Sequence, residues 1–194
     1  MTTTTQAPAR STTVDLALVA AFAALVAVCS ILPAINVSTF APITLQTFGV
    51  LLAGAVLGAR RGLLAVLLWL AVGAAGLPVF ANGKAGLAVL AGPTGGYIAG
   101  MVVGVVLIGA AAQTLARTGR VTNPALIVVG GLAAVLVIHA LGIVGLNLRA
   151  GLDLAAAAKV DAAFWIGDII KLVAAAVVAA AVHRAFPGLL RRGA

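Results

Sequence analysis

The sequence predicts an all-α integral membrane protein with six transmembrane helices and both termini in the cytoplasm. Hydrophobic residues make up 63% of the 194 residues and charged residues only 8%, which is too little polar surface for a water-soluble domain. Apolar runs close to the length of about 20 residues that spans a bilayer follow one another along the chain. Nearly all basic residues lie between these runs, so the charges mark where the chain leaves the membrane.

Charges, prolines and glycine clusters divide residues 14–186 into six expected spans. They are Val14 to Ala34, Thr44 to Ala59, Gly62 to about Gly76, Thr94 to Leu115, Ala125 to Leu148 and Asp161 to Ala185. The third span is expected to break at the sequence GLPVF because proline cannot donate to the helical hydrogen-bond ladder. A Gly-rich connection, Ala81 to Pro93, follows it. Outside this six-helix domain we expect a polar N-terminal tail (1–13) and a basic C-terminal tail (187–194).

The distribution of basic residues predicts the orientation, since cytoplasmic loops are enriched in Lys and Arg. In a six-span arrangement one side receives Arg10, Arg60, Arg61, Arg117, Arg120, Arg184, Arg191 and Arg192, whereas the other receives Lys84, Arg149 and Lys159. The first side is therefore predicted to be cytoplasmic. The irregular segments around Pro42, GLPVF and the Gly-rich connection face the opposite side. Irregular backbone at membrane depth requires protein cover or a cavity, which predicts a pocket roofed by loops.

Asp168 and Lys171 are the strongest candidates for ligand binding, because ionisable groups inside a span normally face a site or one another. At spacing i, i+3 they share one helix face. A carboxylate accepts hydrogen bonds and an ammonium donates them, so together they suit a neutral polar group such as a cyclic urea. The alternative is an ion pair that satisfies itself and only fixes the helix.

The Gly-rich connection supplies further candidates in Asn82, Lys84 and Tyr97. A phosphate-binding loop is excluded because the ending GK[ST] and a preceding strand are missing. Glycines at this position permit close approach of the backbone to a ligand, and Tyr97 offers an apolar ring with a polar tip. Packing remains an equal alternative for Tyr97.

Four other polar residues have more ordinary interpretations. His139 is expected to hydrogen-bond a neighbouring helix, with a proton relay as the alternative. Asp161 shares the face of Asp168 and is either at the pocket mouth or at a solvated helix start. Asp15 is expected to stabilise the N-terminus of the first helix, and His183 to lie at the membrane interface. The single cysteine, Cys29, excludes an internal disulfide and a thiol-based metal site.

Small residues in the first span predict a docking surface for another membrane helix. They repeat at intervals of four in Ala20-x-x-x-Ala24 and Ala23-x-x-x-Ala27, a spacing that lets two helices approach closely. The chain is rich in alanine, so this pattern is weak on its own.

Three segments together resemble the BioY family, the biotin-specific substrate-binding (S) components of energy-coupling factor transporters. They are APITLQTFGVLLAGAVLGARRG (41–62), GLPVF followed by AGPTGGYIAG (91–100), and FWIGDIIK (164–171). The combination of GPTGGY with the later D-x-x-K is the most specific part. The segments occur in family order and, with the intervening hydropathy, cover most of residues 14–186.

The resemblance implies a six-helix protein of the cell inner (plasma) membrane that captures biotin and associates with a transmembrane coupling protein and two ABC-type ATPases. It implies that Asp168 and Lys171 hold the ureido ring and that Asn82 and Tyr97 line the site. The connection containing Pro42, Thr44 and Gln46 would act as a lid, and the alanines of the first span would form the docking surface. No cofactor and no metal are expected, since biotin is the transported ligand.

Other functions fit the sequence less well. An S component for thiamin or riboflavin would share the fold, but 5% aromatic residues argues against stacking such rings. A small proton-coupled carrier or channel could use Asp168, Lys171 and His139, although it would lack the chain of acids typical of relays. An intramembrane enzyme lacks an apparent nucleophile and base. Nucleic-acid binding is disfavoured because the bases do not cluster on a soluble face with aromatic residues between them.

Overall fold

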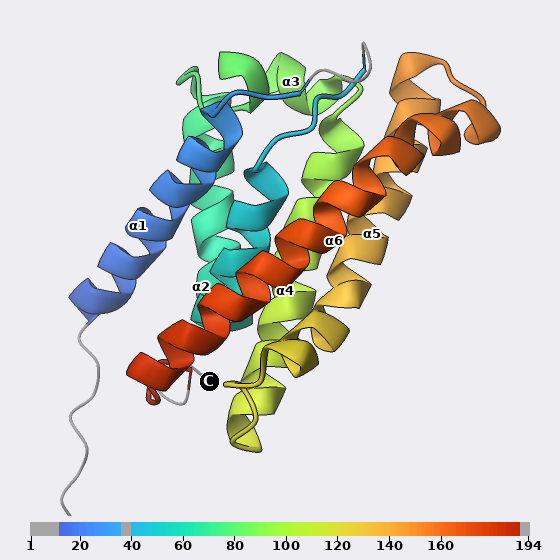
Figure 1. The fold of residues 1–194 in the computed structure, drawn as a ribbon. Helices are drawn as coiled ribbons and strands as arrows, with labels where there is room; N and C mark the ends of the chain where they lie inside the picture. Colours follow the sequence, from blue (N-terminus) through green and yellow to red (C-terminus); the bar gives the residue numbers. More distant parts are fainter. Residues whose placement is uncertain (1–11, 36–39, 191–194) are drawn as a thin grey trace, which may run out of the picture.

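The computed structural model describes residues 12–35 and 40–190, which are helical with short connections and contain no strand. The elements are α1 (Thr12–Ile31), α2 (Gln46–Ala74), the 3-10 helix η1 (Ala81–Gly83), α3 (Leu87–Ala91), α4 (Gly95–Arg117), α5 (Pro124–Ala150) and α6 (Leu154–Ala185) (Figure 1). Five of them, α1, α2, α4, α5 and α6, are long and apolar enough to cross a membrane. Residues 1–11 of the predicted N-terminal tail and 191–194 of the predicted C-terminal tail, which include Arg10, Arg191 and Arg192, lie outside the described ranges.

The second and third predicted spans both lie in α2, because the chain folds back on itself at Gly58. This residue has φ +82° and ψ 177°, a conformation that glycine adopts without a Cβ clash. A Cβ added to Gly62 would lie 3.0 Å from the Cα of Gly54, whereas residues eight apart in a straight helix are about 12 Å apart. α2 is therefore a helical hairpin with arms 46–57 and 59–74.

The first arm of α2 starts part-way down the bundle (Figure 1). At 1.5 Å per residue its 12 residues extend about 18 Å, well short of the roughly 30 Å hydrocarbon core. The space above the arm is occupied by the segment that precedes it, including residues 40–45. This arrangement places irregular backbone at membrane depth, where it requires cover from surrounding helices.

Glycines allow α4 and α5 to pack with their backbones in contact. Gly96, Gly100 and Gly104 lie one turn apart on one face of α4. A Cβ on Gly100 would lie 2.7 Å from the Cα of Ile138, and one on Gly104 would lie 3.1 Å from the Ile138 side chain. Gly96 likewise faces Gly145 of α5. Small residues at intervals of four permit this close approach, so the upper part of α5 lies directly behind the start of α4.

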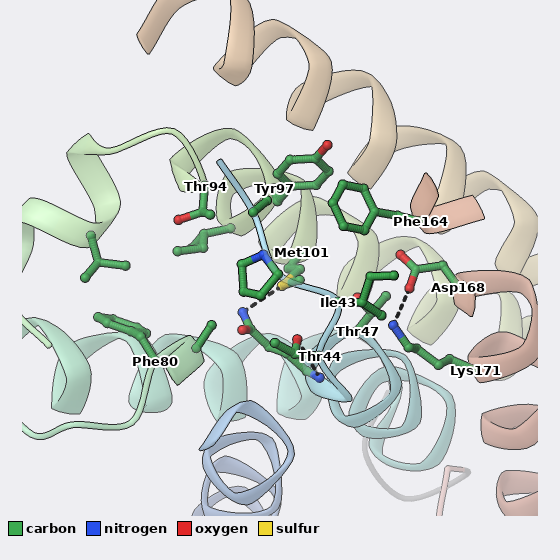
Figure 2. A pocket seen from close by; sticks show the side chains of 16 residues that line it. Ile43, Thr44, Thr47, Phe80, Thr94, Tyr97, Met101, Phe164, Asp168 and Lys171 are labelled. Carbon is green, nitrogen blue, oxygen red and sulfur yellow. Dashed lines mark hydrogen bonds and ion pairs between the residues drawn. The ribbon is translucent and has the colours of Figure 1, made fainter. Parts of the chain in front are cut away.

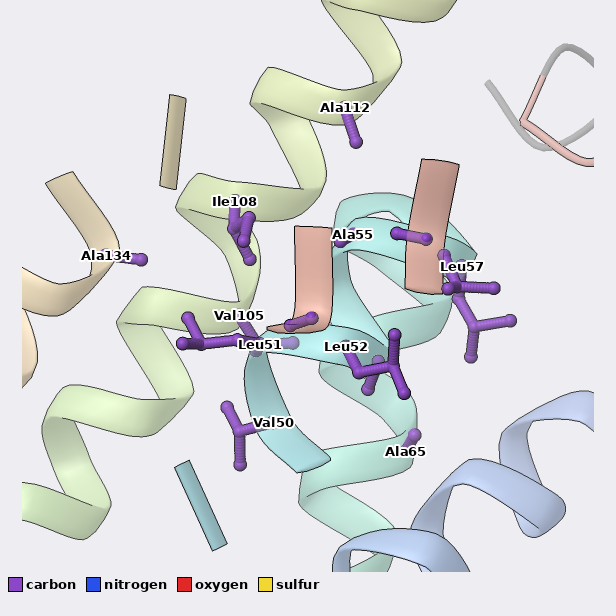
Figure 3. Packing of buried hydrophobic residues seen from close by; sticks show 14 of the residues in the cluster. Val50, Leu51, Leu52, Ala55, Leu57, Ala65, Val105, Ile108, Ala112 and Ala134 are labelled. Carbon is purple, nitrogen blue, oxygen red and sulfur yellow. The ribbon is translucent and has the colours of Figure 1, made fainter. Parts of the chain in front are cut away.

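The apolar core surrounds the first arm of α2. Val50, Leu51 and Ala53 of this arm are completely buried, as are Val105 and Ile108 of α4. Figure 3 shows Val50 and Leu51 of α2 meeting Val105 and Ile108 of α4, with Ala134 of α5 at the edge of the cluster. Because the short arm is buried on all sides, it is a rigid support for the irregular segment 40–45 that lies above it.

Polar side chains join the elements at the end of the bundle where α2 turns. Arg61 donates to the backbone oxygen of Leu57 at 3.2 Å, to that of Leu189 at 2.6 Å, and to Asp15 at 3.1 Å. Asp15 lies in the first turn of α1. Arg61 thus joins the α2 hairpin to α1 and to the chain beyond α6.

His183 is buried against α2 and is not exposed at the protein surface. It is 2% exposed, and its Nε2 is 2.9 Å from the backbone oxygen of Ala55 in α2. The side chain points inward because α6 packs against the α2 hairpin at this level. A helix end contains both buried and exposed positions, and spacing along the sequence did not identify His183 as buried.

Replacing Arg61 with Ala is expected to lower stability by about 2 kcal/mol, the magnitude of hydrogen bonds to a charged group. The loss follows because two backbone oxygens and Asp15 lose their shared donor. Thermal unfolding of the purified protein in detergent would measure it. Arg60→Ala is the matched control, since the neighbouring Arg60 is exposed; equal melting temperatures for the two variants would contradict the assigned role.

Candidate functional site

A cavity opens at the end of the bundle opposite the α2 turn. The empty space inside it is about 580 Å³, a figure that includes the solvent of the open mouth. The lining comes from segment 40–45, α2, Phe80 and Ala81, α3, α4 and α6 (Figure 2). The lining residues are Ala41, Pro42, Ile43, Thr44, Gln46, Thr47, Phe80, Ala81, Val89, Thr94, Tyr97, Ile98, Met101, Phe164, Asp168 and Lys171.

Asp168 and Lys171 provide the charged groups of the cavity wall. Lys171 Nζ donates to Asp168 Oδ1 at 2.7 Å, and the side chains of Lys171 and Asp168 are 11% and 7% exposed, respectively. This bond leaves further N–H groups on Lys171 and a second carboxylate oxygen on Asp168. The pair thus presents both donors and acceptors from one face of α6 (Figure 2).

Most of the remaining wall is apolar. Phe164 and Tyr97 pack edge to face, with ring centroids 5.8 Å apart, and Met101 and Ile98 continue the surface along α4. Phe80 contributes a ring from the GLPVF break. A polar pair set in such a wall can orient a compact ligand whose remaining surface is apolar.

The position of Phe80 depends on a glycine and a tryptophan of α2. A Cβ on Gly73 would overlap the Phe80 ring. The ring also packs edge to face against Trp69, with centroids 5.2 Å apart, while Trp69 Nε1 donates to the backbone oxygen of Val79 at 2.9 Å. α2 ends at Ala74, Gly76 follows with φ +108°, and these contacts fold the chain back so that Phe80 reaches the cavity.

The predicted lid residues Pro42, Thr44 and Gln46 all line the cavity. Ile35 and Ile43 exchange two backbone hydrogen bonds of 2.9 Å each, which ties the two sides of this connection together. Gln46 is nearly buried and donates from Nε2 to the sulfur of Met101 at 3.2 Å. The connection therefore covers one side of the cavity and is anchored to α4.

Asn82 and Lys84 do not line the cavity. Both are exposed in and just after η1, although the neighbouring Phe80 and Ala81 reach the wall. Asn82 has φ +58°, a left-handed conformation that asparagine tolerates better than most residues. Their participation in ligand binding remains a prediction.

Asp161 is neither at the pocket mouth nor at a solvated helix start, so both expectations for it were wrong. It is 1% exposed, because α6 begins seven residues earlier, where Asp153 caps the helix by accepting a hydrogen bond from the backbone N–H of Ala156 at 2.8 Å. Asp161 accepts hydrogen bonds of 2.8 Å from Tyr97 and from Trp165 Nε1. It lies in the protein interior behind the cavity wall.

His139 forms the hydrogen bond to a neighbouring helix that the sequence led us to expect. Its Nδ1 lies 2.9 Å from Asp161 Oδ1, and its Nε2 lies 3.5 Å from Asp168 Oδ2. Trp165 stacks on the imidazole at 4.2 Å between centroids. The sequence did not assign Trp165, although its position four residues after Asp161 placed it on the same helix face.

The alanines of the predicted docking surface divide between two faces of α1. Ala20 and Ala24 are exposed, Ala27 is half-buried, and Ala23 is buried against the core. Only the repeat Ala20-x-x-x-Ala24 is therefore available to another helix. Within residues 12–35 and 40–190, no group of three or more His, Cys, Asp or Glu side chains could hold a metal ion.

Comparison with known proteins identifies the family. The sequence model of the BioY family matches residues 1–188. A protein named biotin transporter BioY from Rhizobium etli is 39% identical over 182 residues, covering 92% of this chain and 97% of the relative. Its namesake from Rhodobacter capsulatus is also 39% identical, covering 92% and 98%.

A solved structure has the same fold. The crystal structure of the S component for biotin from an ECF-type ABC transporter superposes with a TM-score of 0.82 at 27% identity, covering 91% of this chain and 95% of that one. The relatives are transport proteins and not enzymes. Together with the apolar helices, these matches establish a multi-pass membrane protein. The chain belongs to the BioY family.

Proposed function

We propose that this protein is the high-affinity biotin-capture component of an energy-coupling factor transporter for biotin uptake. The observation that carries the proposal is the Asp168–Lys171 pair, set in an otherwise largely apolar cavity open at one end of the bundle. The biotin transporters and the biotin S component that resemble the chain support the same ligand.

The chemistry of biotin matches this wall. The cyclic urea has two N–H donors, which suit the carboxylate of Asp168, and a carbonyl acceptor, which suits the ammonium of Lys171. The fused sulfur ring would pack among Phe164, Tyr97 and Met101. The anionic tail would then extend toward the mouth, and Lys84 and the backbone N–H groups of the Gly-rich connection, which follows the lining residues Phe80 and Ala81, would bind its carboxylate. Biotin is the transported ligand, and no cofactor takes part.

The proposed topology has six crossings of the inner (plasma) membrane, with the two arms of α2 counted separately and both termini cytoplasmic. In Figure 1 the start of α1, the α2 turn and the ends of α4 and α6 share one end of the bundle. The exposed bases Arg60, Arg117, Arg120 and Arg184 belong to these segments, which supports placing this end in the cytoplasm. The cavity then opens to the outside, where biotin is captured.

The proposed partners are a transmembrane coupling protein and two ABC-type ATPases. The sequence of residues 1–194 contains no phosphate-binding loop, which agrees with ATPases supplied by partner chains. Ala20 and Ala24 place small side chains on the exposed face of α1, and small side chains allow a partner helix to approach closely. The rest of the apolar surface would contact lipid.

An ion-coupled carrier is the second candidate, because Asp161, His139, Asp168 and Lys171 form the kind of chain that could pass a proton. This chain occupies only about 15 Å of α6. Beyond it, residues 172–182 are all Leu, Val or Ala. This apolar stretch separates Lys171 from His183 and Arg184 in the last turn of α6, which favours a binding site over a transmembrane relay.

Titration of the detergent-purified protein with biotin, thiamin and riboflavin tests the proposal. We expect tight saturable binding of biotin and none of the other two, because the cavity offers a urea-sized polar pair and few rings for stacking. Isothermal calorimetry would give the affinities and the stoichiometry. Absence of biotin binding by the intact protein would refute the proposed function, and preferential binding of thiamin or riboflavin would redirect it to another vitamin.

Replacing Lys84 with Ala is expected to weaken biotin binding by about two- to fivefold, as for an exposed charge that attracts an anion without a buried contact. The same titration measures it at low and high salt, and the difference should shrink as salt rises. Lys159→Ala is the matched control, since Lys159 is another exposed lysine near the same end. Equal affinities of the two variants would remove Lys84 from the site.

A further inference from the structure

A second pair of ionisable groups lies behind the cavity wall and has no role in the binding scheme above. Asp161 accepts hydrogen bonds from three donors: the Tyr97 hydroxyl, Trp165 Nε1 and His139 Nδ1. A carboxylate that receives three donors is stabilised in its ionised form. Asp161 is 1% exposed, and an ionised carboxylate buried to this extent requires a positive partner.

His139 is the group placed to supply that positive charge. The titratable and charged side chains that meet here come from three helices: Tyr97 of α4, His139 of α5, and Asp161, Asp168 and Lys171 of α6. Lys171 is paired with Asp168 at 2.7 Å. With a neutral imidazole the cluster would carry a net charge of −1; with an imidazolium it is balanced.

The two ring nitrogens of His139 both face carboxylates. Nδ1 donates to Asp161, and Nε2 lies 3.5 Å from Asp168 Oδ2, buried and without a hydrogen-bond partner. An unprotonated Nε2 would direct its lone pair at a carboxylate, whereas a protonated one is attracted to it. The Trp165 ring, stacked at 4.2 Å with an interplanar angle of 18°, adds an attractive face for a cation.

We infer that His139 is protonated on both ring nitrogens and is a positioning residue for the ligand site. It does not line the cavity, but it connects two residues that do. Through Asp161 it fixes the hydroxyl of Tyr97 on α4, and directly it attracts the free oxygen of Asp168 on α6. His139 thereby sets the separation of the polar groups on two sides of the cavity. The positioning role rests on the proposed function; the protonation does not.

The protonation is tested on ligand-free protein by NMR with ¹⁵N-labelled histidine. The chain has only two histidines, and His183→Gln leaves the signals of His139 alone. We expect both ring nitrogens of His139 to carry protons at neutral pH in this variant and in the unaltered chain. A spectrum with a single protonated nitrogen overturns the inference, whether or not biotin binds.

The positioning role is tested by biotin titration of His139→Gln. Glutamine keeps hydrogen-bonding groups but removes the charge, so we expect affinity to fall about tenfold, the magnitude of one charge-assisted hydrogen bond. His183→Gln is the matched control and should bind biotin as the unaltered protein does. His183 does not line the cavity, and its Nε2 forms a hydrogen bond with the backbone oxygen of Ala55. An unchanged affinity of folded His139→Gln refutes the positioning role.

If His139→Gln does not fold, Asp161→Asn provides a second variant with which the inference about His139 can be tested by NMR. It keeps the shape of the side chain while removing the charge that His139 balances, so the NMR signals of His139 should shift toward a single protonated nitrogen. Retention of both protons in this variant would show that Asp161 does not hold the charge of His139. Failure of the unaltered protein to bind biotin would count against the proposed function and the positioning role that rests on it, but not against the protonation of His139.

Discussion

Replacing Asp168 with Asn, or Lys171 with Ala, is expected to weaken biotin binding by roughly 30-fold to several-thousand-fold. Each change removes a group that would meet the urea and also leaves the other member of a buried ion pair uncompensated. Calorimetric titration of the detergent-purified variants measures the loss. Full affinity in both variants would show that biotin does not contact this pair.

The double variant Asp168→Asn/Lys171→Met separates ligand binding from structural pairing. Both single changes are expected to lower the melting temperature, because an unpaired charge stays buried. The double variant has no such charge and should regain much of that stability. If the pair only fixes α6, affinity should recover together with stability. If the pair binds the urea, stability recovers and affinity does not.

The apolar runs predicted the long helices well because membrane helices are constrained by composition along their whole length. The expected spans Thr94 to Leu115 and Ala125 to Leu148 differ by no more than two residues at either end from α4 and α5. Asn123 caps α5 by accepting a hydrogen bond from the backbone N–H of Ala125. Such local signals can be read without knowledge of the neighbouring helices.

The reversal in α2 was predicted near the right position but for another reason. We expected the pair Arg60 and Arg61 to stop the second span, whereas the chain turns at Gly58 and Arg61 lies buried just after the turn. Arg61 binds groups on α1 and beyond α6, which are distant in sequence. A charge that is paired inside the protein cannot be distinguished from an exposed one by hydropathy alone.

The cavity was predicted in part. Asp168, Lys171, Tyr97 and the connection near Pro42 meet there, since each carried a local signal of charge or backbone irregularity. The contact between His139 and Asp161 had no such local signal in the sequence, because it depends on how α5 packs against α6. That register is set by packing, including the glycines between α4 and α5, and sequence spacing within one helix does not reveal it.

Replacing Gly142 with Ala is expected to weaken biotin binding by about tenfold or more, as for an overpacked core position. Gly142 lies on α5 behind the Tyr97 ring, and an added Cβ would overlap Cδ1, Cε1 and Cζ of that ring. The ring must move toward the cavity, which takes its hydroxyl away from Asp161. Calorimetric titration measures the affinity, and tyrosine fluorescence quenching would report the displaced ring.

Gly167→Ala is the matched control for this substitution. Gly167 is also a helical glycine near the site, on α6, but the nearest atom to an added Cβ is 4.0 Å away on Ile43. Removing a helical glycine without a clash should stabilise the protein by up to about 1 kcal/mol and leave biotin affinity unchanged. The contrast between the two variants separates a steric effect on Tyr97 from the general effect of replacing glycine.

The effect of Gly142→Ala should depend on the ring that it displaces. In a Tyr97→Ala background the added methyl group meets no ring, so Gly142→Ala should then cause little further loss of affinity. Residues in direct contact are expected to show such non-additivity. Equal losses in the two backgrounds would show that Gly142 acts through the packing of α4 on α5 instead. Non-additivity would show that a glycine on α5, which touches no ligand, determines where Tyr97 stands in the cavity wall.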